Sequence, residues 1–234
     1  PEVRLRLLRR ELGQVPRSGA GCIMPRSAKP APVLASSPSA GRKRVSPDRA
    51  GSTGRARAHN QDGPMVDPFA VELTRTSDLA RAGLMSRQVE RLIDGGTLVR
   101  VRRGIFAPNA AWSELRAEGR MVVAARAWRM SAGVEPVFSH LTAAAIHGLP
   151  LFRTGPMAVH TVIPEPRKGA TPGVVRHRGA TDDGLIEVHG LVVTDVARTM
   201  AATARSFAAA TSIPVADAAL RAVSGDHGDP RVLL

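Results

Sequence analysis

One stretch, residues 74–107, constrains the fold of this chain more than any other. It opens with a short predicted helix, for which Thr76 or Ser77 is a suitable N-cap. Gly83 ends that helix, because glycine readily takes the positive φ found at many helix C-termini. The apolar pattern then restarts, so a second helix is expected after a short turn, with Ser86 as its N-cap.

The second predicted helix has one apolar face and one basic face. Val89, Leu92 and Ile93 fall at i, i+3 and i+4, so they line the apolar face. Arg87 and Arg91 are four residues apart and lie roughly opposite that face. The helix can therefore bury one side in a core while it offers guanidinium groups to a partner.

A basic hairpin is predicted directly after the second helix. Residues 98–102 alternate between apolar residues and arginine, as in a half-buried strand. Residues 103–104 supply a turn, and residues 105–107 return. The hairpin arginines expected to meet DNA phosphates are Arg100, Arg102 and Arg103.

Helix, turn, helix and basic hairpin follow in the order of a winged helix-turn-helix. In that motif the second helix enters the DNA major groove and the hairpin lies along the backbone as a wing. The predicted DNA-binding residues are Ser86, Arg87, Gln88, Arg91, Arg100, Arg102 and Arg103. The open alternative is a winged-helix module that contacts a protein and leaves its arginines solvated.

The rest of the chain predicts a small mixed α/β domain over residues 112–225. The expected helices cover residues 112–132, 140–148, 195–204 and 215–223, with Thr194 as the cap of the third. The expected strands cover residues 136–138, 157–163, 173–177, 185–188 and 191–193. The fold class is therefore α/β, in an α+β arrangement with a winged helix-turn-helix at residues 65–108.

Residues 1–64 are predicted to be a disordered tail rich in Pro, Ser and Arg, because they lack apolar periodicity. The whole chain holds 33 Lys and Arg against 20 Asp and Glu, a net charge of +13. The tail has 13 basic and 4 acidic residues, whereas residues 65–234 have 20 and 16. Because most of the excess charge lies in the tail, overall basicity is weak evidence for nucleic-acid binding.

No catalytic or metal-ligating residue is predicted, and no cofactor. Seven histidines are present, and His160, His177 and His189 could converge from separate strands, but the chain has no HExxH sequence. Ser139 and His140 are adjacent, and neighbours on a helix point about 100° apart, so we do not expect a nucleophile–base pair. The chain has no GxSxG sequence and no phosphate-loop pattern ending in GK[ST]. The chain is therefore not expected to be an enzyme.

The compartment is expected to be the cytoplasm. Cys22 is the only cysteine, which excludes an intramolecular disulfide and a cysteine metal cluster. No run of 18 apolar residues is present, so no membrane partner is expected. The chain contains no tyrosine, two Trp and five Phe, and such scarcity of aromatic rings argues against stacking recognition of single-stranded nucleic acid.

Several segments resemble the AbiEi-type antitoxins of type IV toxin–antitoxin (abortive infection) systems, in the form common in actinobacteria. The matching segments are LMSRQV (84–89), GTLVRV (96–101), RGIFA (103–107), SHxxAAxxxGL (139–149) and LVVTDVARTM (191–200). The resemblance implies a transcriptional regulator that binds promoter or operator DNA, represses its own operon and opposes a cognate nucleotidyltransferase-like toxin. Some proteins with this N-terminal architecture continue into a restriction-endonuclease-like domain.

That continuation leaves a further alternative open, in which this chain is the non-catalytic part of a nuclease. Such a nuclease needs clustered carboxylates and a nearby lysine to hold a metal. Residues 165–168 place Glu and Lys one residue too far apart for the usual Glu-x-Lys motif. We therefore expect no metal-dependent cleavage of DNA by this chain.

Overall fold

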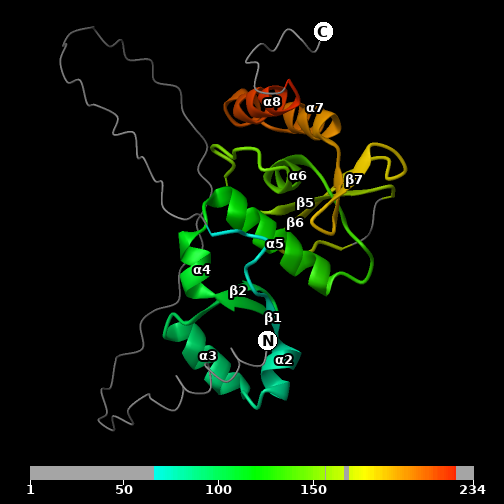
Figure 1. The fold of residues 1–234 in the computed structure, drawn as a ribbon. Helices are drawn as coiled ribbons and strands as arrows, with labels where there is room; N and C mark the ends of the chain where they lie inside the picture. The colour runs from blue at the N-terminus through cyan, green and yellow to red at the C-terminus, as the bar shows by residue number, and fades with distance from the viewer. Residues whose placement is uncertain (1–65, 156, 166–168, 225–234) are drawn as a thin grey trace, which may run out of the picture. The chain divides into compact units, whose positions relative to one another are not determined.

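The computed structural model describes residues 66–155, 157–165 and 169–224. The predicted tail, residues 1–64, and Lys168 lie outside the described residues. Within them the fold is mixed α/β, with helices and two sheets (Figure 1). The predicted fold class is confirmed at that level. No helix in these ranges combines the length and the hydropathy needed to cross a membrane.

The first sheet lies beside two short helices. Together, this sheet and its helices comprise β1 (Thr74–Arg75), α2 (Thr76–Arg81), α3 (Ser86–Asp94), β2 (Leu98–Arg102) and β3 (Ile105–Pro108). The strands pair antiparallel in the order β1-β3-β2. Gly83 has a φ of 82° between the two helices, as its predicted place at a helix C-terminus requires. The predicted hairpin is also present, with Arg103 and Gly104 at its turn.

The second sheet has five strands in the order β6-β5-β4-β8-β7. Its region contains α4 (Asn109–Glu114), α5 (Ala117–Ser131), β4 (Val137–Phe138), α6 (His140–Ile146), β5 (Val159–Ile163), β6 (Val174–Arg178), β7 (Leu185–Val188), β8 (Leu191–Thr194), α7 (Val196–Ser206) and α8 (Ala209–Val223). β5 pairs parallel with β6, and β4 pairs parallel with β8. The β4–β5 and β7–β8 pairs are antiparallel.

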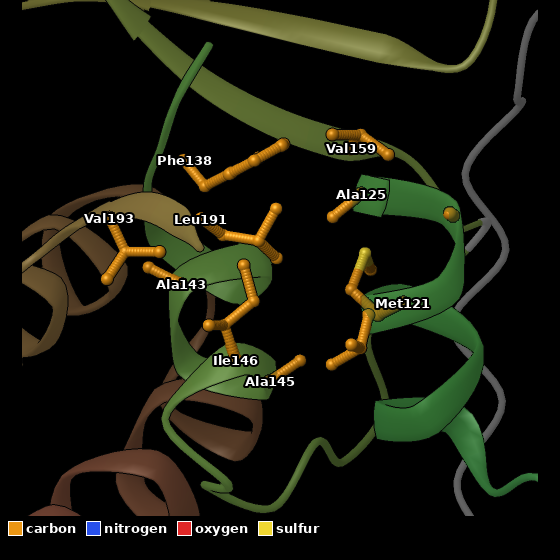
Figure 2. Packing of buried hydrophobic residues seen from close by; sticks show 11 residues of the cluster. Met121, Ala125, Phe138, Ala143, Ala145, Ile146, Val159, Leu191 and Val193 are labelled. Atoms are coloured by element: carbon orange, nitrogen blue, oxygen red, sulfur yellow. The ribbon is translucent and has the colours of Figure 1, made fainter. Parts of the chain in front are cut away.

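The main core lies between α5, α6 and the five-stranded sheet. Figure 2 shows Met121 and Ala125 of α5 across from Ala145 and Ile146 of α6, with Phe138 of β4 and Val159 of β5 on the side of the sheet. Phe138 and Ala125 are completely buried. Small side chains let the two helices approach closely, so the alanine-rich sequence of α6 serves packing. A second cluster joins α6 to α8 through Ala144 and Val215.

The long helix predicted for residues 112–132 is instead two helices, α4 and α5. The break falls at Leu115 and Arg116, which both take extended backbone angles. Leu115 is buried, and its Cδ2 atom lies only 2.9 Å from where a Cβ on Gly119 would be. The chain therefore turns so that Leu115 folds back onto the side-chain-free surface of Gly119. That contact depends on tertiary packing, which helical periodicity does not report.

Three predicted caps are wrong by one residue. The N-caps of α2, α3 and α7 are Arg75, Met85 and Asp195. In α2 and α3 the stabilising side chain is the third helical residue, which reaches back to the backbone N–H of the cap. In α7 the Asp195 carboxylate accepts a hydrogen bond from the Arg198 N–H at 2.7 Å, so the aspartate replaces Thr194 as the cap.

Candidate nucleic-acid interface and histidine cluster

Helix α3 buries one face and exposes the other, as its sequence predicts. Val89 and Leu92 are each 5% exposed, and Ile93 is half-buried. Arg87 and Arg91 are both exposed on the other side of the helix. Because the buried residues fix the rotation of α3, the two arginines must face outward.

The start of α3 uses one predicted contact residue for capping. Gln88 accepts a hydrogen bond from the Met85 N–H through Oε1, at 2.7 Å. This bond stabilises the helix start and leaves only the side-chain NH₂ group of Gln88 for other partners. Ser86 is the first residue of α3 and is exposed, so its hydroxyl group lies at the surface.

An ion pair joins α3 to the hairpin. Arg100 of β2 donates to the Glu90 carboxylate at 2.6 Å, and its guanidinium carbon lies 5.6 Å from the centre of the Phe106 ring. The two charged side chains are 46% and 57% exposed. An ion pair this exposed contributes at most about 1 kcal/mol, so Arg100 could exchange Glu90 for another anion.

Arg102 of the hairpin contacts α5. Its guanidinium carbon lies 4.2 Å from the centre of the Trp128 ring, and its Nε donates to Ser131 at 3.1 Å. Burial lowers the pKa of Arg102. These contacts join the hairpin to α5. They also occupy the guanidinium group of Arg102, which the sequence predicted to contact a DNA phosphate.

A β-bulge explains this orientation of Arg102. Arg100 pairs with Phe106, but Arg102 pairs with Ile105, so Val101 is an extra residue in β2. One extra residue reverses the alternation of side chains beyond it. Arg102 therefore lies on the opposite face of the sheet from Arg100, whereas simple alternation would place the two together.

Arg103 remains exposed at the hairpin turn, and no hydrogen bond or ion pair holds it within the described ranges. Residues 74–108 as a whole contain seven arginines and three carboxylates. Exposed arginines therefore lie on α3 (Arg87 and Arg91) and on the hairpin (Arg100 and Arg103), and this local basic charge does not depend on the tail.

Three histidines meet in the second sheet region. His160 Nδ1 lies 2.9 Å from His177 Nε2, across the parallel pair β5–β6. The His140 ring stacks on His177, with ring centres 3.6 Å apart and an angle of 19° between planes. Of the three strand histidines expected to converge, His160 and His177 do so. His189 instead lies in the β7–β8 turn and stacks on Phe69.

Ser139 and His140 are in contact, contrary to the prediction from helical geometry. Ser139 Oγ lies 2.9 Å from His140 Nδ1. The reason is local: Ser139 is extended, and His140 has a φ of 52° at the first position of α6. A positive φ is uncommon for a residue with a side chain, so the surrounding structure must hold His140 in place.

Burial keeps this histidine cluster neutral. Burial, followed by repulsion from His177, His160 and Arg205, lowers the pKa of His140 to about 3. Burial and His177 lower the pKa of His160 to about 4, and burial lowers that of His177. A base this weak is poorly suited to take a proton from Ser139 at neutral pH. The contact therefore orients the His140 ring.

The cluster does not have the arrangement of a metal site. Stacked rings direct their nitrogens past one another rather than toward a common point. In residues 66–155, 157–165 and 169–224, no group of three or more His, Cys, Asp or Glu side chains is placed to hold a metal ion. The chemistry that neutral rings offer here is hydrogen bonding.

Sequence reasoning did not identify this cluster as a site. The detectable signals were the Ser139–His140 pair and a histidine in each of two neighbouring strands. Their convergence depends on the parallel register of β5 and β6, in which His160 faces Val175 and His177 faces Val162. Comparisons of the chain with protein-family models and with curated proteins find no match.

Proposed function

We propose that residues 74–108 form a winged helix-turn-helix that binds double-stranded DNA. In this proposal α3 enters the major groove and the β2–β3 hairpin is the wing. The observation that carries it is the outward pair Arg87 and Arg91 on a helix whose other face is buried. Arg103, which is exposed on the neighbouring hairpin, supplies a further basic group.

The dimensions of α3 support this docking. An α-helix with its side chains is about 10–12 Å across, which fits the major groove of B-DNA, about 12 Å wide, and the nine residues of α3 span about 13 Å. A short, straight helix of this length can lie in the groove with its first turns facing the bases. Arg87 and Arg91 are one turn apart, so both would face the same stretch of base edges.

The contact residues divide into two classes in this proposal. Arg87 and Arg91 read base edges, where a bidentate arginine–guanine pair is worth about 1–3 kcal/mol of discrimination. Ser86, Arg100 and Arg103 contact phosphates, which adds affinity without sequence choice. Gln88 keeps its capping bond and offers only its NH₂ donors. Arg102 is left out, because Trp128 and Ser131 already hold it.

The biological role that fits such a site is transcriptional regulation. We propose that the protein is a cytoplasmic, non-enzymatic regulator that binds promoter or operator DNA, in keeping with its resemblance to AbiEi-type antitoxins. Repression of its own operon and opposition to a cognate nucleotidyltransferase-like toxin follow from that resemblance alone. The DNA contact is the part that rests on the geometry of α3.

A titration of labelled DNA from upstream of the gene, with a scrambled duplex as control, tests the proposal. Arg87→Ala should narrow the affinity gap between the two duplexes. Arg103→Ala should weaken both together and reduce the slope of log affinity against log salt by about 0.9. Arg221→Ala is the matched control, because Arg221 lies on α8 and pairs with Asp217. If the wild-type protein binds neither duplex at low salt, the motif docks on protein.

A further inference from the structure

A pocket of about 260 Å³ opens beside the histidine cluster. Its walls come from the start of α6, from β6 and from α7. The lining includes His140, His177, Arg178, Arg198 and Arg205, and no carboxylate of the described part of the chain belongs to it. Three guanidinium groups around one small cavity repel one another, so such a cavity favours an anion.

Two of the three arginines are available to a ligand. Arg198 donates to the backbone carbonyls of Ala180 and Asp183, so it holds the turn before β7. Arg178 and Arg205 are exposed, and neither side chain has a hydrogen bond or ion pair with any residue that the structure describes. Their guanidinium groups are therefore free to form paired hydrogen bonds to an oxyanion.

His140 adds a directed donor to the pocket. It is only 6% exposed, and Ser139 occupies its Nδ1. No described residue bonds its Nε2, yet every fully enclosed side-chain nitrogen or oxygen in the described ranges has a partner. Nε2 is therefore not fully enclosed, and the open space that His140 lines is this pocket. When Ser139 donates to Nδ1, the ring proton is on Nε2 and is directed at the ligand.

We propose that this pocket binds a small phosphate monoester, with Arg178 and Arg205 pairing with its phosphate oxygens and His140 Nε2 donating to the same group. This site is separate from the proposed DNA interface, and no residue is shared between them. Phosphate binding can be measured without DNA, so the failure of either proposal leaves the other standing.

Charge and size select the ligand class. A phosphate monoester carries about −1.5 to −2 charges at neutral pH, which two unpaired guanidinium groups can match. A carboxylate carries one charge and would leave one arginine unmatched. The pocket is slightly smaller than the about 300–1,000 Å³ of typical ligand sites, so it suits a phosphate with a small attached group.

The neutral state of the histidines is consistent with this role. Burial lowers the pKa of His140 and His177, so their rings are neutral at pH 7. They therefore add no positive charge that would attract every kind of anion equally. A neutral imidazole N–H can still donate to an anion. A bound phosphate would raise the pKa of His140, because it places negative charge beside the ring.

Calorimetric titration of the full chain with inorganic phosphate and with glycerol 3-phosphate, in a phosphate-free buffer at pH 7, tests the proposal. Both probes should bind the wild-type protein, and glycerol 3-phosphate should bind at least as tightly as phosphate. Arg178→Gln and Arg205→Gln should each weaken binding about tenfold or more, because each removes charge-assisted hydrogen bonds. Both residues are exposed, so both variants should fold, which their thermal midpoints would verify.

Arg221→Gln is the matched control, since it removes the same charge from α8 outside the pocket. It should bind both probes as the wild type does. The proposal is overturned if neither probe binds, if both pocket variants bind normally, or if acetate binds as tightly as phosphate. Loss of DNA affinity in Arg205→Gln would also overturn it, because the pocket would then belong to a DNA surface.

Discussion

Mild acid should destabilise this fold through its buried histidines. An unfolded histidine has a pKa near 6.5, whereas the folded values are about 3 for His140 and about 4 for His160. At pH values between the folded and the unfolded pKa, the unfolded chain binds more protons than the folded chain. The free energy of unfolding therefore falls as the pH falls. The contribution of both residues is fully present above about pH 6.5.

The size of the effect follows from those pKa values. From pH 7 to pH 5 each of the two histidines should lose about 2 kcal/mol of stability, or about 4 kcal/mol together. Small domains have total stabilities of about 5–15 kcal/mol, so the loss should be easy to detect. Carboxylates titrate mainly below this window. The groups facing His140 are His160 of β5, His177 of β6 and Arg205 of α7.

Urea unfolding at several pH values between 7 and 5 measures the effect. His160→Asn should reduce the loss by about 2 kcal/mol, whatever its effect on stability at pH 7, because one titrating group is gone. His189→Gln is the control, since His189 is an exposed histidine outside the cluster. A free energy of unfolding that stays constant from pH 7 to 5 would show that the buried histidines do not destabilise the fold in acid. So would a slope that disappears in the control variant.

Two further substitutions test the packing. Phe138→Ala should destabilise the fold by about 3–5 kcal/mol, because Phe138 is completely buried in the main core, and urea unfolding measures this loss. Arg102→Ala should lower stability by about 1 kcal/mol through the lost Trp128 contact. The same variant should leave the salt dependence of DNA binding unchanged, and a slope reduced by about 0.9 would show that Arg102 contacts phosphate after all.

Local patterns in the sequence predicted the helix–hairpin region well. The burial of Val89 and Leu92, the exposure of Arg87 and Arg91, and the turn at Gly104 all follow from spacing within a few residues. The orientation of Arg102 does not, because one bulge at Val101 reverses the strand face. A bulge depends on the partner strand, which the alternation within one strand does not report.

The histidine cluster required information that no short stretch contains. His140, His160 and His177 come from three elements, and their contact depends on strand register and on one positive φ. The break at Leu115 has a similar origin, since it depends on the fit of that side chain against Gly119. Sequence spacing thus described each element better than the contacts between elements.

The affinity of the protein for upstream and scrambled DNA, measured with and without Arg87 and Arg91, tests whether α3 enters the major groove. We expect the wild-type protein to prefer the upstream duplex, and the Arg87→Ala, Arg91→Ala double variant to bind both duplexes with nearly equal affinity. The pocket variant Arg205→Gln should keep the wild-type preference. An unchanged preference in the double variant, with its fold intact, would contradict the placement of α3 in the major groove.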